Sequence, residues 1–66
     1  MKNNLRVARA EVRMTQQQLA DAAGVSRQTV NAIESGRFVP STVLALKMAV
    51  IFGKRVEDIF ILEAND

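Results

Sequence analysis

Residues 15–37, TQQQLADAAGVSRQTVNAIESGR, carry two short helical patterns separated by a glycine. Thr15 and Gln18 have the spacing of a capping box, in which each side chain bonds the backbone N–H of the other residue. Ser26 is placed as the N-cap of a second helix, and Gly24 stands where the first helix would end in a left-handed residue. The spacing predicts helices over 15–23 and 26–35, crossing steeply at a tight turn, which is the helix-turn-helix unit.

Hydrophobic periodicity and capping residues predict three further helices around this unit. Their expected ranges are residue 3 or 4 to residue 12, residues 41–52 with Ser41 as the N-cap, and residues 56–60;. In the first of them, the spacing of Leu5, Ala8 and Val12 places these side chains on the face expected to point inward. The expected fold class is therefore all-α, with five helices in a single domain over residues 1–66.

The C-terminal tail is apolar for a chain end. We expect Phe60–Leu62 to form a short strand that pairs either with its symmetry mate or with N-terminal residues. The alternative interpretation is that Ile59 and Phe60 complete the core of one chain while the residues beyond them fray.

The composition argues against catalytic and metal chemistry. Cys and His are both absent, which removes disulfides, the commonest zinc ligands and the commonest general base;. The sequence therefore predicts no enzyme, no metal site and no cofactor. No apolar run approaches the ~20 residues that cross a bilayer, and the start of the chain lacks a signal-peptide pattern. We expect a soluble, cytoplasmic protein with no membrane partner and no domain for a small-molecule effector.

Positive charge is concentrated in the first part of the chain. The whole chain has a net charge of only +2, but residues 1–37 contain six basic and three acidic side chains. Residues 38–66 contain three basic and four acidic side chains. The basic excess thus lies in the part of the chain that contains the two helices of residues 15–37, where it would attract an anionic partner.

One face of the helix over 26–35 carries side chains that match the edges of DNA bases. Val30 and Ile33 define the inward face, which leaves Arg27, Gln28 and Asn31 on the outer side. Arginine can bond guanine O6 and N7, and glutamine or asparagine can bond adenine N6 and N7. Taken alone, this set is more often a plain solvated face than a base-reading one; the capped helices and the glycine turn beside it favour base contact.

Other polar residues in the same window suit phosphate oxygens, because helix starts offer free N–H groups and a positive dipole. The candidate phosphate-contacting residues are Gln16, Gln17, Ser26, Thr29 and Arg37. For the glutamines the alternative is ordinary helix formation and capping.

The run MTQQQLADAAGVSRQTVNAIESGRFVPS resembles the Xre/Cro-like helix-turn-helix repressors through T-Q-x-x-L-A, G-V-S and E-x-G. With ALKMA and VEDIF the resemblance extends over nearly the whole chain, and the length is most similar to small dimeric repressors of the cytolysin-regulator type. It implies a lambda-repressor-like domain that binds operator DNA as a dimer, with Arg27, Gln28 and Asn31 toward bases. It also implies a structural ion pair between Arg9 and Glu34. Ala32 departs from the pattern, because a longer polar residue often stands there.

A homodimer is also indicated by apolar residues that a chain of this size cannot cover, since small domains bury little of their surface. The helix over 41–52 is apolar nearly all round, with Lys47 as its only charge. The candidate dimer-interface residues are Val50, Ile51, Phe60, Ile61 and Leu62. Double-stranded DNA and a second copy are thus the expected partners. The alternative function is an antitoxin or a protein-interaction adaptor that uses the same fold to hold another protein.

Overall fold

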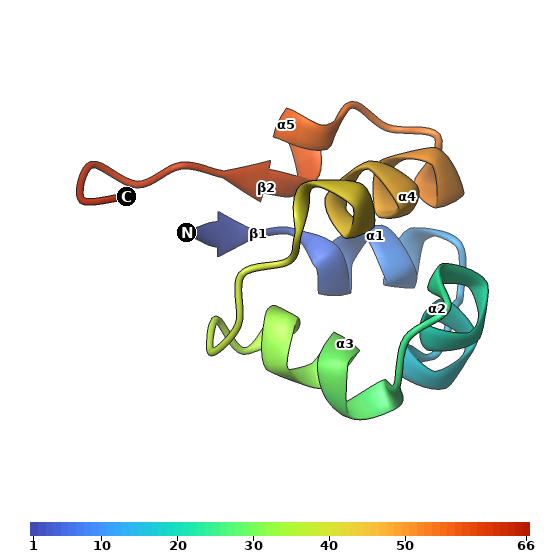
Figure 1. The fold of residues 1–66 in the computed structure, drawn as a ribbon. Helices are drawn as coiled ribbons and strands as arrows, with labels where there is room; N and C mark the ends of the chain where they lie inside the picture. The colour runs from blue at the N-terminus through green and yellow to red at the C-terminus, as the bar shows by residue number, and fades with distance from the viewer.

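The computed structural model describes all 66 residues, as five helices with a two-residue strand near each end of the chain. Helices α2 and α3 lie together at one end of the molecule, below α1, α4 and α5, and the two strands extend to one side (Figure 1). The elements are β1 (Lys2–Asn3), α1 (Leu5–Glu11), α2 (Gln16–Ala23), α3 (Arg27–Glu34), α4 (Thr42–Phe52), α5 (Val56–Ile59) and β2 (Phe60–Ile61). The expected five-helix, lambda-repressor-like fold is confirmed.

The starts of α2, α3 and α4 are fixed by the predicted capping side chains. Thr15 Oγ1 accepts from the backbone N–H of Gln18 at 3.0 Å, and Gln18 Oε1 accepts from that of Thr15 at 2.9 Å. Ser26 Oγ accepts from the N–H of Thr29 at 3.1 Å, and Ser41 caps α4 in the same way. Each helix begins one residue after its cap, because the cap itself has extended backbone angles;.

Helix α1 ends in a left-handed residue that is not a glycine, which the sequence does not predict. Arg13 adopts a left-handed φ of 54°, and the N–H of Met14 bonds the carbonyl of Arg9 at 2.9 Å. The end of α3 has the same bonding, with Gly36 in the left-handed position at a φ of 80°. A glycine normally marks this position, because other residues meet a steric cost there.

The first helix is shorter than expected, and one of its inward residues was assigned wrongly. It begins at Leu5, whose N–H bonds Asn3 Oδ1, and ends at Glu11. Leu5 and Ala8 are buried as expected, but Val12 is exposed. The reason is that Val12 lies beyond the last helical turn, so its side chain does not continue the buried face.

Apolar side chains from all five helices meet in one core. The largest that are fully buried are Leu5, Leu19, Val30, Ile33, Met48 and Ile59. Ala20 and Ala23 of α2 are buried with them. Removing each large aliphatic side chain from water stabilises the fold by roughly 1.5–3 kcal/mol, which is the main force that holds α3 in place.

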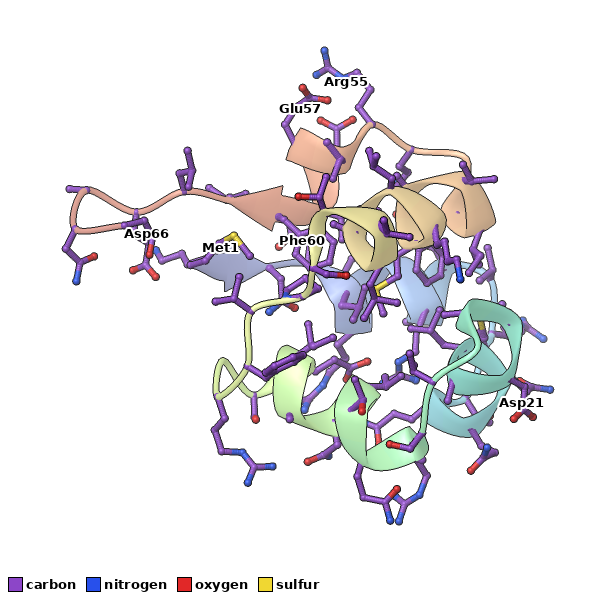
Figure 2. All side chains as sticks on the ribbon, viewed as in Figure 1. Met1, Asp21, Arg55, Glu57, Phe60 and Asp66 are labelled. Atoms are coloured by element: carbon purple, nitrogen blue, oxygen red, sulfur yellow. The ribbon has the colours of Figure 1, made fainter.

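The predicted C-terminal strand pairs with the N-terminal residues of its own chain. Strands β1 and β2 are antiparallel, with Lys2 opposite Ile61 and Asn3 opposite Phe60. The side chain of Phe60 is only 8% exposed, and it lies under α4 as part of the core (Figure 2). The expected strand thus closes the single chain, and Leu62 lies just beyond it. None of the helices is both long and apolar enough to span a membrane.

Candidate nucleic-acid interface

Helix α3 is anchored by one face and exposes the other. Val30 and Ile33 are buried in the core, whereas Arg27, Gln28 and Asn31 are exposed. Together with Ala32 and Arg37 they line a surface hollow of about 450 Å³. We call these five residues the recognition face. The three side chains expected to contact bases therefore line one hollow, together with Ala32 and an arginine from the following turn.

Hydrogen bonds hold Arg37 against the end of α3. Its Nε donates to Ser35 Oγ at 3.0 Å and its Nη2 donates to Asn31 Oδ1 at 3.1 Å. Ser35 Oγ in turn donates to the carbonyl oxygen of Ala32 at 3.1 Å. This arrangement was not predicted, because Arg37 follows the turn at Gly36 and helical spacing gives no register beyond that point.

Apart from Arg37, the expected phosphate-contacting residues lie around the starts of α2 and α3, and all of them have a hydrogen-bond partner within the chain. Ser26 Oγ and Thr29 Oγ1 lie 3.0 Å apart beside the first turn of α3. Gln17 Nε2 donates to Asp21 Oδ1 at 2.9 Å on the exposed side of α2. Gln16 is half-buried and turns toward α3 instead of outward.

Three helices meet at the carboxylate of Glu34, whose side chain is only 2% exposed. Arg9 of α1 donates to it through both Nε and Nη2, the latter at 3.0 Å from Oε1. Gln16 Nε2 of α2 adds a third bond at 3.2 Å. The Nη1 of Arg9 donates to the Met14 carbonyl at 2.8 Å, so the guanidinium is held on both sides. The cluster fixes the C-terminal end of α3 relative to α1 and α2.

The contacts of this cluster set the charge states within it. Burial by itself would raise the pKa of Glu34, but the hydrogen bonds from Arg9 and Gln16 and the charges of Arg9 and Arg6 outweigh burial. The pKa of Glu34 therefore lies below its ordinary value, and the bond to Glu34 raises that of Arg9. Because the carboxylate is neutralised inside the fold, it does not repel an anion that approaches α3.

A helix-turn-helix family model matches residues 5–59, which includes all five helices. The chain belongs to the helix-turn-helix family. Over 66 residues it is 52% identical to an uncharacterised HTH-type transcriptional regulator of Methanocaldococcus jannaschii, covering 100% of both chains. It is 48% identical to one of Bacillus subtilis over the same full lengths.

Solved structures of regulators have the same fold. The restriction-modification controller protein C.AhdI from Aeromonas hydrophila matches with a TM-score of 0.78 at 30% identity, over 85% of each chain. The SOS-response transcriptional repressor LexA from Eubacterium rectale matches with a TM-score of 0.78 at 31% identity, over 83% of this chain and 58% of the other. This family member is thus a transcriptional regulator with a DNA-binding fold, and its relatives are regulators rather than enzymes.

The charged side chains of this helix-turn-helix regulator differ between the recognition face and the α5 segment. The recognition face carries Arg27 and Arg37 and no acidic side chain. The side chains of Arg55 and Glu57 on the α5 segment point away from the molecule at the end opposite α3 (Figure 2). Arg55 is paired with the carboxylate of Asp58 at 3.2 Å. The recognition face of α3 thus carries positive charge with no carboxylate among its own residues.

The expected dimer-interface residues fall into two groups. Val50 and Ile51 line an apolar groove along α4 together with Val43 and Leu46. The second group, Phe60–Leu62, lies at the strand pair, which extends to one side of the helices (Figure 1). Val50 is 81% exposed and Leu62 is 79% exposed, whereas Phe60 is already covered by its own chain. Only the exposed members of the two groups are available to a partner.

Proposed function

We propose that this regulator represses transcription by binding a near-palindromic operator as a homodimer, with α3 of each copy in the major groove. One observation carries the proposal: α3 is fixed to the core by Val30 and Ile33 while its opposite side exposes Arg27, Gln28 and Asn31. An exposed helix of this kind fits the width of the major groove, and its side chains match the hydrogen-bonding groups of base edges.

Phosphate contacts would set the position of α3 on the duplex. The start of α3 offers free backbone N–H groups beside Ser26 and Thr29, and Gln17 stands on the exposed side of α2. Gln16 has a second amide hydrogen beyond the one that bonds Glu34, and Arg37 keeps its Nη1 free of partners within the chain. Such contacts fix register and orientation, whereas the bases provide specificity.

Two copies are proposed because one α3 reads only a few base pairs. A two-fold dimer places two recognition helices on half-sites about 34 Å apart, which accounts for a near-palindromic operator. Val50, Ile61 and Leu62 are apolar and exposed, which supports an interface that uses α4 and the C-terminal segment. A dimer bound over a promoter excludes polymerase by occupying its site, and this is the basis for proposing a repressor.

The proposal is tested by changing the recognition face. DNA sites selected by the wild-type protein from a randomised duplex library serve as probes, and affinity is measured by fluorescence anisotropy. Arg27→Ala and Gln28→Ala are each expected to lower affinity for the selected site by about 1–3 kcal/mol through lost base contacts. Arg55→Ala, at the opposite end of the molecule, is the matched control and should leave it unchanged. Unchanged affinity and base preference in both recognition-face variants would refute the assignment of α3.

A further inference from the structure

The orientation of the Asn31 side-chain amide is determined by the residue that contacts it. A guanidinium has only N–H donors, so the Asn31 atom that faces Arg37 must be the oxygen. Arg37 Nη2 lies 3.1 Å from Oδ1 of Asn31. The amide NH2 group therefore lies on the side away from Arg37, where it forms no hydrogen bond within the chain, and Asn31 is exposed in the hollow of the recognition face.

Arg37 is itself held in this position by directional bonds. Ser35 Oγ has one hydrogen, which it donates to the carbonyl of Ala32, so only its lone pairs face the Nε of Arg37;. The guanidinium is thus bound through Nε to Ser35 and through Nη2 to Asn31. A lysine has a single ammonium group and cannot reproduce this planar, two-point contact.

We propose that Arg37 is a positioning residue for base recognition, which binds the Asn31 oxygen and leaves the Asn31 NH2 group as the unpartnered donor for DNA, so that Asn31 selects guanine over adenine. The proposal rests on the proposed function. A free asparagine pairs with adenine by accepting from N6 and donating to N7, and this pairing needs both amide atoms. With Oδ1 engaged by Arg37, the unpartnered NH2 group matches an edge that offers acceptors, and guanine offers two adjacent ones, N7 and O6.

The test compares base preference at one position of the selected site. That position is defined as the one at which Asn31→Ala abolishes preference in a randomised-library selection. The wild-type protein is expected to select guanine there. Arg37→Lys and Ser35→Ala each release the Asn31 oxygen, so the ratio of guanine to adenine should fall by about tenfold. Arg55→Lys is the matched control and should keep the wild-type ratio. Circular dichroism melts confirm that each variant is folded.

Arg37→Lys keeps the positive charge, so its affinity for random DNA should stay within about twofold of wild type, which separates positioning from simple attraction. Three results overturn the inference. The first is selection of adenine by the wild type, and the second is an unchanged guanine preference in both variants. The third is that Arg37→Ala lowers the affinity equally for all DNA sequences and reduces the slope of log affinity against log salt concentration by about one. That last result would make Arg37 a phosphate contact only. Absence of any sequence preference in the wild type would instead contradict the proposed function itself.

Discussion

At the scale of single residues, Glu34 links the stability of the regulator to pH. Its folded pKa lies below the ordinary value of 4.5. A group with a depressed folded pKa contributes stability that is fully present above its unfolded pKa and is lost as pH falls through the folded one. We therefore expect the free energy of unfolding to decrease as pH drops below about 4.5, because protonation breaks the charge pairing with Arg9.

Chemical denaturation at a series of pH values checks this expectation. Glu34→Gln removes the titrating group, so its stability should fall less steeply than that of the wild type below about pH 4.5. The matched control is Glu57→Gln, because Glu57 is exposed on α5 and lies away from this cluster. Its pH profile should follow the wild type. Parallel profiles for Glu34→Gln and the wild type would show that the cluster does not couple to folding.

At the scale of elements, the backbone conformation that ends α1 is higher in energy than the one that ends α3. Arg13 occupies the left-handed position that Gly36 occupies in α3, with the same backbone hydrogen bonds. A left-handed conformation costs a non-glycine residue about 1–2 kcal/mol, whereas the extra freedom of glycine in the unfolded chain costs about 0.5–1 kcal/mol. Arg13→Gly should therefore stabilise the fold by about 0.5 kcal/mol.

The reciprocal change at Gly36 provides the comparison. A Cβ at Gly36 meets no atom within 4 Å, so Gly36→Ala adds backbone strain without a steric clash. Urea titrations measure both variants, and Gly36→Ala should lower the free energy of unfolding by about 0.5–1 kcal/mol. A loss of stability in Arg13→Gly would mean that the arginine side chain stabilises α1 by more than the strain it causes.

The elements also show what could be predicted from the sequence. The starts of α2, α3 and α4 depend on a single side chain that bonds a nearby backbone N–H, so Thr15, Ser26 and Ser41 were sufficient to place them;. The end of α1 was not predictable in detail, because the usual glycine signal is absent and Arg13 takes its place. The strand pair needs two segments 57 positions apart to meet, as Lys2–Asn3 and Phe60–Ile61 do, and periodicity leaves the partner of such a strand open.

Part of the candidate site could also be predicted from the sequence, and part of it could not. Burial of Val30 and Ile33 follows from helical spacing, so the exposure of Arg27, Gln28 and Asn31 was predictable;. The bond from Arg37 to Asn31 was not, since it depends on how the chain turns at Gly36 and on side-chain conformations beyond the helix. The partner of a long polar side chain is set by tertiary geometry, and the sequence records only that such a side chain is present.

At the scale of the whole molecule, the proposed dimer makes a prediction about exposed apolar residues. Val50 on α4 and Leu62 beyond β2 are both largely solvent-exposed in a single chain. Because an interface would bury them, each contributes roughly 1.5–3 kcal/mol of association free energy when covered. Val50→Glu and Leu62→Glu should each raise the dimer dissociation constant by about tenfold or more, as measured by sedimentation equilibrium. Neither side chain is part of the core, so the circular dichroism spectrum should be unchanged.

Val7 on α1 is a suitable control because it is also an exposed valine but lies among polar side chains, beside Glu11 and Lys54. Val7→Glu should keep the wild-type dissociation constant. Weakened association in both test variants would support a symmetric interface in which α4 and the tail both take part, since two-fold symmetry of a dimer repeats every contact. A wild-type protein that sediments at the 7.3 kDa of one chain at micromolar concentration would exclude the dimer in the absence of DNA. The two copies would then bind their half-sites independently, and altered half-site spacing should leave the affinity unchanged.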